Sequence, residues 1–322
     1  MYTETYSGIN SFLKGACKLL LSEGVKRVTR GKICYELPEP FLFKLTEPKA
    51  RIVTIPERKW NRTLPYAESL WIASGRNDLL YICHYLERMR DFSDDGMFMR
   101  GGYGPRFRDY NGSNDDYHIS TINERKPNSV DQLRYIVKCF SNDIETRRAV
   151  ISLGDPMKDD FDQSWNLKDS KDIPCTRELH FIKQSTNNKL DLIVKMRSND
   201  LIWGASAVNI FNCTFMQEYV SAILGLEIGN YYHLADNMHY YEDFKDMIKV
   251  IANISEVNDE VMNFHKSFTS LEEFDVLVSK LGHEENLMRK DMSSYKYVQM
   301  GDEFFQHWYD TLYKYNFQKN NR

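Results

Sequence analysis

The spacing of apolar residues predicts a succession of helices in the first half of the chain. Residues 9–21 place their apolar side chains at the 3.6-residue period of one helix face, and Gly24 follows as a stop signal. Three further segments have a helical pattern: residues 64–74, 78–90 and 130–141. Residues 91–129 are polar and rich in Gly, Asp and Asn, which predicts a loop too long to be a simple connection. We therefore expect this loop to have a function.

The middle of the chain favours β-strands. Apolar and polar residues alternate over residues 190–197, which is the period of a strand with one buried face. Four other segments are expected to be strands: residues 33–35, 41–45, 148–153 and 178–183. A helix is predicted over residues 207–226. From about residue 242 the pattern is helical to the end, with breaks near four positions: residues 255, 267–270, 282 and 301. We therefore expect a boundary that separates residues 1–242 from residues 243–322.

The composition excludes several classes of protein. The 322 residues include 42 Lys and Arg against 46 Asp and Glu, a formal net charge of −4, which lacks the basic excess that nucleic-acid binding requires. No apolar run reaches the roughly 18 residues that a membrane span needs, so we expect none. The N-terminal segment does not have the pattern of a secretory signal. The protein is therefore expected to be cytoplasmic.

The six cysteines are scattered without a Cys-x-x-Cys pair, at positions 17, 34, 83, 139, 175 and 213. This distribution is typical of reduced thiols in a cytosolic protein and predicts neither disulfides nor a metal site. An isolated cysteine is most often a small core residue. Cys175 is different, because it follows Pro174 and is accompanied along the chain by arginines and by a polar run over residues 229–241.

The motifs around Cys175 have an ordered arrangement. They are Thr29-Arg30-Gly31, Glu68-Ser69-Leu70-Trp71 with Gly75 and Asn77, Tyr103-Gly104-Pro105-Arg106-Phe107-Arg108, Arg147-Arg148, Pro174-Cys175, Arg197-Ser198-Asn199-Asp200, Asn209 and His239-Tyr240-Tyr241. Each motif alone has an ordinary structural explanation, such as a surface position for Glu68 or a core position for His239. Together, in this order, they resemble the thymidylate synthase family, which includes the phage-type pyrimidine hydroxymethylases, over about residues 8–242.

The resemblance implies a fold, a quaternary structure and a set of reactants. The fold would be α/β, with a large mixed, kinked β-sheet and flanking helices, and residues 243–322 would form a helical C-terminal extension of unknown role. The protein would be a homodimer in which two sheets pack back to back and the active site is shared across the interface. The reactants would be a pyrimidine nucleoside 5′-monophosphate and 5,10-methylenetetrahydrofolate, or a related pterin one-carbon donor, without a metal. Neither nucleic acid nor membrane is an expected partner.

The resemblance also assigns catalytic roles. Cys175 would be the nucleophile. The chemistry of the residues agrees, because addition of a thiolate to C6 of a pyrimidine gives C5 the carbanion character that attack on a one-carbon donor needs. Arg197 and the phosphate-binding arginines would favour the thiolate with their positive charge. Glu68 would act in general acid–base catalysis through water, and the Tyr103 hydroxyl would lie near the C5 proton.

The remaining residues would bind substrate. Arg30 and Ser198 would hold the 5′-phosphate together with Arg197, since guanidinium groups bind phosphate bidentately. The pair Arg147–Arg148 would reach the phosphate of the partner subunit. The other substrate-binding residues are Asp200 in the Arg-Ser-x-Asp strand, Asn209 at the base, and His239 and Tyr241 at the sugar.

Four departures from the family pattern bear on the reaction. Where the synthases have a pair of tryptophans that shields the folate, the positions here are near Met89 and Phe92. Thr176 replaces the usual histidine after the cysteine, and residues 204–209 form a run one residue longer than its counterpart. The short apolar tail of the synthases is replaced by a helical extension. Weaker exclusion of water favours addition of water, rather than hydride, to the exocyclic methylene at C5. The sequence therefore predicts hydroxymethylation.

The identity of residue 209 bears on which pyrimidine base the protein recognises. An Asn amide carries a donor and an acceptor and can pair with N3–H and O4 of uracil, whereas the phage deoxycytidylate enzymes have Asp at this position. We therefore expect dUMP as the substrate, provided that the inserted residue leaves Asn209 in place. The alternatives are reductive methylation of dUMP to dTMP, hydroxymethylation of dCMP or CMP, and a catalytically silent nucleotide-binding paralogue. A further alternative is a protein that binds a partner through the aromatic face around Trp308.

Overall fold

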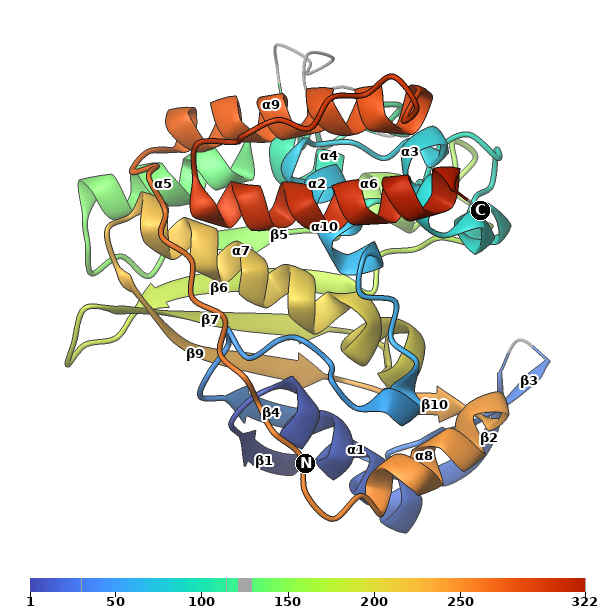
Figure 1. Cartoon of the computed structure of the whole chain (residues 1–322). Helices are drawn as coiled ribbons and strands as arrows, with labels where there is room; N and C mark the ends of the chain where they lie inside the picture. The colour runs from blue at the N-terminus through green and yellow to red at the C-terminus, as the bar shows by residue number, and fades with distance from the viewer. Residues whose placement is uncertain (30, 114, 121–128, 322) are drawn as a thin grey trace.

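A six-stranded mixed sheet forms the centre of the molecule (Figure 1). The computed structural model describes residues 1–29, 31–113, 115–120 and 129–321. Across the sheet the strands follow the order β1 (Tyr2–Tyr6), β4 (Phe41–Leu45), β9 (Glu227–Ala235), β7 (Lys189–Met196), β6 (Thr176–Lys183) and β5 (Val150–Ser152). The pairs β1–β4 and β7–β9 are parallel, and the other neighbours are antiparallel.

A smaller four-stranded sheet adjoins the first. Its order is β2 (Val25–Thr29), β3 (Lys32–Glu36), β10 (Met238–Tyr241) and β8 (Asn199–Asp200). Two strands continue from one sheet into the other after two intervening residues, β7 into β8 and β9 into β10. These bends place the ends of β7 and β9 beside the smaller sheet. The expected α/β class, with a mixed sheet and flanking helices, is confirmed.

Helices α7, α10 and α9 are layered over one face of the six-stranded sheet (Figure 1). The bounds of the helices are α1 (Ile9–Glu23), α2 (Leu64–Ala73), α3 (Leu79–Tyr85), α4 (Tyr103–Arg108), α5 (Gln132–Asn142), α6 (Pro156–Asp159), α7 (Ile210–Ile223), α8 (Lys245–Ala252), α9 (Leu271–Lys290) and α10 (Glu303–Asn320). Helix α7 lies against the sheet, where the Gln217 side chain donates to the carbonyls of Leu190 in β7 (2.9 Å) and Asn230 in β9 (3.0 Å). Because α7 is covered on several sides, most of its residues are buried.

The C-terminal helices pack on this assembly. The Phe215 ring of α7 stacks on Phe304 of α10 at 4.5 Å between centroids. The Trp308 indole of α10 is fully buried and donates to the Tyr66 carbonyl of α2 at 2.7 Å. Helix α8 packs against α1 instead. One hydrophobic core therefore includes residues on both sides of position 242, and a functional division at this position stays a prediction.

Several predicted elements need correction. Residues 91–129 contain helix α4, and a break at Leu86, where φ is −151°, separates α3 from the 3-10 segment Glu87–Phe92. Helix α9 passes through Gly282 without a break, because one glycine costs a helix only about 1 kcal/mol. Residues 253–270 form no helix. Five strands were not predicted: β1, β2, β8, β9 and β10.

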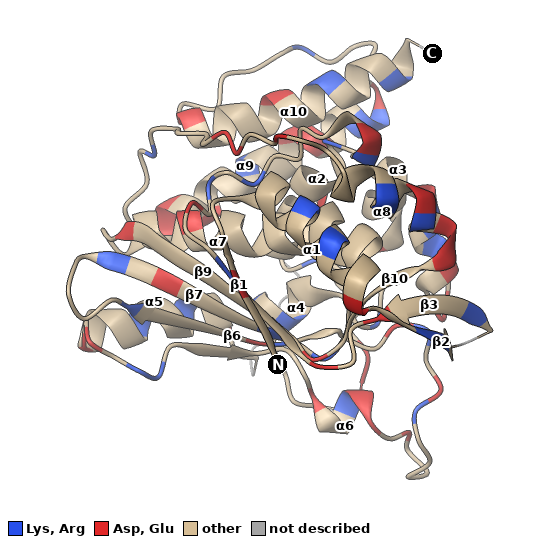
Figure 2. Cartoon of the chain, turned by 90° about the horizontal axis from the view of Figure 1, so that it is seen from below, with Lys and Arg blue, Asp and Glu red and all other residues tan. Residues whose placement is uncertain are grey.

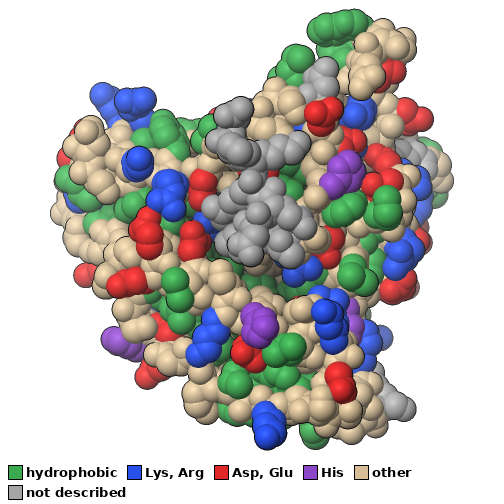
Figure 3. Space-filling model, turned by 90° about the horizontal axis from the view of Figure 1, so that it is seen from above, with side chains coloured by type: hydrophobic (Ala, Val, Ile, Leu, Met, Phe, Trp, Pro, Cys, Tyr) green, Lys and Arg blue, Asp and Glu red, His purple; other side chains and the backbone are tan. Residues whose placement is uncertain are grey.

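Charges of both signs are interspersed over the molecule (Figure 2), and the face in Figure 3 mixes charged side chains with apolar patches. Among the described helices, none combines the length and the apolar character that crossing a bilayer requires. The described residues also include no cluster of three or more His, Cys, Asp or Glu side chains suited to hold a metal ion.

Candidate active site

Cys175 and Arg197 are neighbours because they flank a β-hairpin. Cys175 immediately precedes β6, Arg197 immediately follows β7, and the strands pair with Thr176 opposite Met196. The Arg197 backbone N–H donates to the Cys175 carbonyl at 2.9 Å. The number of residues between Cys175 and Arg197 is thus set by the length of the β6–β7 hairpin.

The Arg197 side chain is fixed to the segment that leads into Cys175. Its Nε donates to the Pro174 carbonyl at 3.0 Å, and its Nη2 donates to the Ile173 carbonyl at 2.9 Å. The residue is otherwise exposed. Since a guanidinium has five N–H donors, the remaining donors can bind an anion beside the cysteine.

The Tyr103 hydroxyl is anchored to the residue after the cysteine. Its oxygen accepts from the Thr176 backbone N–H at 3.2 Å and from Thr176 Oγ1 at 3.0 Å. Burial raises the Tyr103 pKa above its usual value, and the nearby Cys175 raises it further. The phenol therefore stays protonated. Because its oxygen already accepts two bonds, its own proton remains for a third partner.

Glu68 is a partly buried carboxyl on α2. Desolvation raises its pKa to about 7, and a hydrogen bond from the Asn212 side chain opposes this shift. A carboxyl that titrates near neutrality can both give and take a proton at physiological pH. The carboxyl at this position thus has a raised pKa, and its role in acid–base catalysis stays a prediction.

Asn209 lies at the junction between a π-helical segment, η4 (Leu201–Asn209), and α7. The Ile210 N–H bonds to the Ala205 carbonyl five residues earlier, which is the π-helical pattern. A π-helical turn absorbs an extra residue without displacing the helix after it. This explains how the run over residues 204–209 can be one residue longer and still lead directly into α7.

A small cavity brings several of these side chains together. Asn209, Tyr103 and Thr176 line it, and the other lining residues are Ile72, Phe107, Leu153, Leu179, Asn212, Cys213 and Met216. The Asn209 Nδ2 atom lies 3.7 Å from Met196 Sδ. Polar groups from α4, β6 and α7 thus converge on an otherwise apolar space, as in many ligand sites.

Asp200 and His239 are adjacent through the smaller sheet, in which β8 pairs with β10. Asp200 Oδ1 accepts from the backbone N–H groups of Ile202 (2.6 Å) and Trp203 (2.7 Å), whereas Oδ2 is buried without a hydrogen-bond partner among the described residues. Burial raises the Asp200 pKa, and the His239 charge opposes the shift. The Oδ2 atom is therefore an acceptor that a ligand could use.

His239 is oriented by its neighbours. Its Nδ1 lies 2.8 Å from Asn237 Oδ1 and donates to that acceptor, which leaves Nε2 for another contact. The Tyr241 ring meets the His239 ring edge-to-face, with 5.5 Å between centroids. The two residues assigned to the sugar are therefore in contact.

Three of the other predicted phosphate-binding residues lie in the part of the chain that the structure describes. Arg147 and Arg148 are exposed in the turn between α5 and β5, and Ser198 is partly buried between β7 and β8. Arg30 lies outside the described residues. The role of all four in phosphate binding stays a prediction.

Some motif residues have structural partners instead. Asn77 is fully buried and donates to the carbonyls of Met99 and Tyr117, both at 2.8 Å. Arg106 forms a buried bidentate pair with Asp159. These residues stabilise the turns around α4 and so hold Tyr103 in place.

The sequence analysis gave no role to Thr176 in holding Tyr103, and it did not name Asn212 or Asp172. The Thr176 hydroxyl holds Tyr103 and Asn212 bonds to Glu68, as described above. Asp172, three residues before Cys175, accepts from the Gly101 N–H at 2.7 Å, and burial raises its pKa to about 6. Asn212 could have been found, because it follows Asn209 by three residues and so occupies the next turn of the helix.

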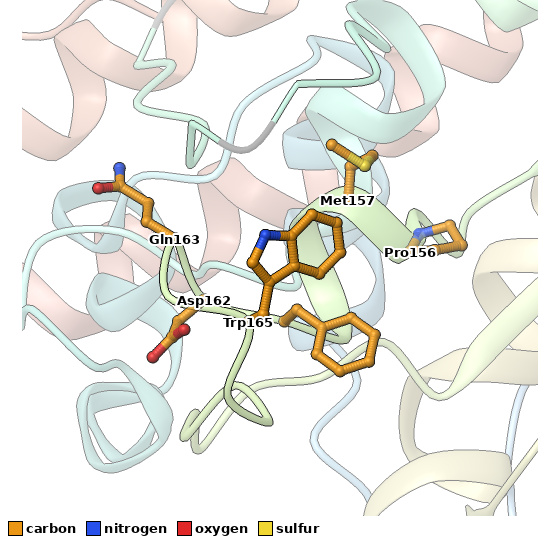
Figure 4. Close-up of a pocket in the computed structure, with 6 residues that line it drawn as sticks. Pro156, Met157, Asp162, Gln163 and Trp165 are labelled. Atoms are coloured by element: carbon orange, nitrogen blue, oxygen red, sulfur yellow. The ribbon is translucent and has the colours of Figure 1, made fainter.

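A second pocket lies in the segment between β5 and Cys175 (Figure 4). It is lined by residues from α6 and the loop after it: Pro156, Met157, Phe161, Asp162, Gln163 and Trp165. The Trp165 side chain is 73% exposed, and its ring centroid lies 5.7 Å from that of Phe161. This pocket shares no residue with the cavity beside Tyr103.

Comparisons with known proteins agree with the motifs. The family model described as thymidylate synthase matches residues 13–284. A deoxyuridylate hydroxymethyltransferase of Bacillus phage SP01 is 34% identical over 243 residues, which are 76% of this chain and 60% of that protein. The namesake from Pseudomonas phage M6 is 32% identical over 77% of this chain and 64% of its own length. A thymidylate synthase of Symbiobacterium thermophilum is 25% identical over 57% of this chain and 60% of its own length. The chain thus spans about 60% of these curated relatives.

Proposed function

Because this chain belongs to the thymidylate synthase family, we propose that it transfers a one-carbon unit to C5 of dUMP and releases 5-hydroxymethyl-dUMP. The observation that carries the proposal is the similarity, at 31–34% identity, to three phage proteins named deoxyuridylate hydroxymethyltransferase. Asn209 in the cavity supports the choice of uracil, because its amide complements N3–H and O4.

Cys175 begins the proposed reaction. Its sulfur forms a bond to C6 of the pyrimidine, and the electrons of the C5–C6 double bond move toward C5 and O4. Arg197, which is fixed to the backbone beside Cys175, supplies positive charge that favours the thiolate and binds the 5′-phosphate.

Two other groups handle protons. The Glu68 carboxyl, with its pKa of about 7, exchanges protons with O4 through water. The Tyr103 hydroxyl, held by Thr176, binds the water molecules around C5 and assists removal of the C5 proton. Departure of the sulfur from C6 restores the aromatic ring at the end.

5,10-Methylenetetrahydrofolate is the proposed one-carbon donor, and it supplies the carbon at the oxidation level of formaldehyde. The residues present fit a ligand with N–H donors, since Asp200 Oδ2 is a buried acceptor that has no partner among the described residues. The Trp203 side chain, which is 41% exposed and has Arg88 over its ring at 4.6 Å, offers a flat apolar surface nearby in the sequence.

Access of water decides between the two family reactions. In place of the synthase tryptophans, this chain has Met89, which packs against the core, and Phe92, which is 43% exposed. A less shielded site lets water add to the exocyclic methylene at C5, whereas a synthase excludes water while hydride is transferred. Reductive methylation to dTMP is the second candidate, because thymidylate synthases are also among the relatives.

We further propose that the protein works as a cytoplasmic homodimer. Arg147 and Arg148 are exposed, so they are free to contact a molecule outside their own chain. In this arrangement they bind the 5′-phosphate in the site of the partner subunit.

Product analysis tests the proposed function. The protein is incubated with methylenetetrahydrofolate and dUMP, dCMP or CMP, and the nucleotides are identified by mass. We expect 5-hydroxymethyl-dUMP and tetrahydrofolate, and no product with Cys175→Ala. Formation of dTMP with dihydrofolate supports the synthase reaction instead. If no nucleotide is modified although dUMP binds, the protein is a silent paralogue.

A further inference from the structure

Asp172 joins the two segments that lead into the candidate catalytic groups. It lies three residues before Cys175, and its Oδ2 atom accepts from the Gly101 backbone N–H at 2.7 Å. Gly101 in turn lies two residues before Tyr103, the first residue of α4. One carboxylate therefore bonds the segment that precedes the cysteine to the segment that precedes the tyrosine.

The two segments approach each other too closely at this bond for a side chain on residue 101. A Cβ atom at Gly101 would lie 2.8 Å from Asp172 Oδ1 and 2.9 Å from the Asp172 carbonyl oxygen. These distances are shorter than a real Cβ contact allows, so the observed spacing requires glycine. The Asp172 carboxylate and the Gly101 backbone are thus packed directly against each other.

A second contact joins the same two segments a few residues further along. The Tyr103 hydroxyl oxygen accepts from the Thr176 backbone N–H at 3.2 Å and from Thr176 Oγ1 at 3.0 Å. Cys175 lies between Asp172 and Thr176 in the sequence. The bonds at Asp172 and at Thr176 therefore lie on either side of Cys175, and together they fix where α4 begins relative to the cysteine.

Asp172 is itself held by its neighbours. Its backbone N–H donates to Ser170 Oγ at 3.1 Å. The Ser170 hydroxyl donates to Asp94 Oδ2 at 2.6 Å, and the Lys171 backbone N–H donates to Asp94 Oδ1 at 2.9 Å. Asp94 belongs to the loop that leads to Gly101, so the segment before Cys175 is tied to this loop at two places.

The groups around the Asp172 carboxyl favour its charged form at neutral pH. Desolvation raises its pKa to about 6, its backbone hydrogen bond and the charges of Arg106 and Arg100 oppose this shift, and Asp94 adds to it. The neighbouring Tyr103 phenol stays protonated. Because an ionised acceptor forms a stronger hydrogen bond than a neutral one, the bond to the backbone is strongest above pH 6.

We propose that Asp172, through its bond to Gly101, is a positioning residue that sets the Tyr103 hydroxyl against Thr176 and beside Cys175. The inference rests on the proposed function for its catalytic meaning. The geometry behind it can be tested without turnover, because the Gly101 amide and the Tyr103 ring can be observed directly.

NMR of the protein labelled with nitrogen-15 glycine and with carbon-13 at Cζ of tyrosine tests the geometry. The Gly101 signal is identified by its loss in Gly101→Ala, and the Tyr103 signal by its loss in Tyr103→Phe. In the wild type, the Gly101 amide proton should shift with an apparent pKa of about 6. Asp172→Asn keeps an acceptor and should abolish this titration but leave the Tyr103 signal in place. Asp172→Ala should move the Tyr103 signal.

Steady-state kinetics with dUMP supply the catalytic readout. We expect Asp172→Ala to lower kcat by about tenfold or more, because the phenol is misplaced. The KM for dUMP should stay within about twofold, since the lost bond lies outside the nucleotide contacts. Asp172→Asn should keep most of the wild-type kcat. Gly101→Ala, which forces the two segments apart, should lower kcat as Asp172→Ala does.

Asp291→Ala is the matched control. Asp291 is an exposed carboxylate that also accepts from backbone, at 3.1 Å from the Ser293 N–H, but within its own turn. We expect this variant to keep the wild-type kcat and Tyr103 signal.

Three results would overturn the proposal. The first is a folded Asp172→Ala protein whose Tyr103 signal and kcat are unchanged. The second is an Asp172→Asn protein as impaired as Asp172→Ala, since the charge and not the bond would then matter. If Asp172→Ala does not fold, an unchanged kcat in Gly101→Ala is the third. Absence of turnover in the wild type contradicts the proposed function, while the NMR signals still decide whether Asp172 positions Tyr103.

Discussion

At the scale of single residues, the candidate site depends on contacts that sequence motifs only partly indicate. The motifs placed Cys175, Arg197 and Asn209 in one site, and the structure brings Cys175 beside Arg197 and places Asn209 in the cavity with Tyr103. The hydrogen bonds that orient the side chains could not be predicted from the sequence. Arg197 bonds to backbone carbonyls and Tyr103 bonds to the Thr176 hydroxyl, and no hydrophobic periodicity marks such contacts. A sequence motif indicates which side chains are candidates for the reaction, but the orientation of each side chain depends on tertiary packing.

The identity of residue 209 should set the preference for the base. In the proposed function Asn209 pairs with uracil, whereas Asp at this position would accept from the cytosine amino group and, when protonated, donate to N3. A mismatched buried polar edge costs about 1–3 kcal/mol, which corresponds to about 5- to 150-fold in kcat/KM. We expect the wild type to prefer dUMP and Asn209→Asp to shift the ratio toward dCMP by a factor in this range. A wild type that prefers dCMP or CMP would mean that Asn209 does not read the base.

Glu68 should lower the stability of the folded protein at neutral pH and above. Its folded pKa of about 7 lies above the unfolded value of about 4.3, so the folded state binds this proton more tightly. The cost of ionising Glu68 is absent below the unfolded value and complete above the folded value. Because the carboxyl is partly accessible, we expect Glu68→Gln to stabilise the protein by about 1–2 kcal/mol near pH 8. Near pH 4 the two proteins should be equally stable.

Urea unfolding at both pH values measures this difference. A pH-independent effect of Glu68→Gln, or a loss of stability near pH 8, would show that the carboxyl does not titrate as inferred. The matched control is Glu87→Gln, because the ion pair of Glu87 with Arg90 is exposed and such pairs contribute little to stability.

At the scale of elements, periodic segments were predicted well and special segments were not. The helix over residues 9–21 and the strand over residues 190–197 are present as α1 and β7, since each has one continuous buried face. Strand β2 was missed because four of its five residues are exposed, so that it has no apolar alternation. The π-helical segment η4 was also missed, because its nine residues resemble an ordinary helix and differ only in the hydrogen-bond pattern.

Gly204 in the π-helical segment should be required for the position of Asn209. A Cβ atom at Gly204 would lie 2.7 Å from Asn199 Nδ2 and 2.9 Å from Asn209 Nδ2, closer than atoms can approach without a shift. We expect Gly204→Ala to move the Asn209 amide and to lower kcat/KM for dUMP by about tenfold or more, as a misplaced polar contact does.

Gly225→Ala is unsuitable as a control for this substitution because the residue has a φ of +65°. Gly282→Ala is suitable, since a Cβ there meets no atom within 4 Å. Unchanged kinetics in Gly204→Ala, measured beside this control, would show that the cavity tolerates the displacement of Asn209.

At the scale of the whole molecule, the C-terminal helices support the site without contributing one of its predicted residues. Trp308 of α10 bonds to α2, which carries Glu68, and Asp275 of α9 forms a salt bridge of 2.7 Å with Arg108 of α4, which carries Tyr103. The sequence predicted a helical segment here, but not these long-range contacts, because they join residues that are far apart along the chain.

The proposed shared active site predicts complementation between two inactive variants. Cys175→Ala lacks the nucleophile, and Arg148→Glu removes a phosphate-binding residue that serves the partner. In a mixed dimer, one of the two sites contains neither change. We therefore expect each variant alone to be inactive and the mixture to recover up to about a quarter of wild-type activity, because half of randomly exchanged dimers are mixed and each has one intact site. No recovery despite proven exchange of subunits, or a monomer in solution, would contradict the shared site.

The source of the oxygen in the product tests the central claim most directly. If water adds to the exocyclic methylene at C5, a reaction of dUMP and methylenetetrahydrofolate in water enriched in oxygen-18 yields 5-hydroxymethyl-dUMP whose new hydroxyl carries the label. Because free formaldehyde also exchanges its oxygen with water, the Cys175→Ala protein is run in parallel and should give no labelled nucleotide. A product that is dTMP, with one equivalent of dihydrofolate and no labelled oxygen on the new carbon, would contradict the proposed hydroxymethylation.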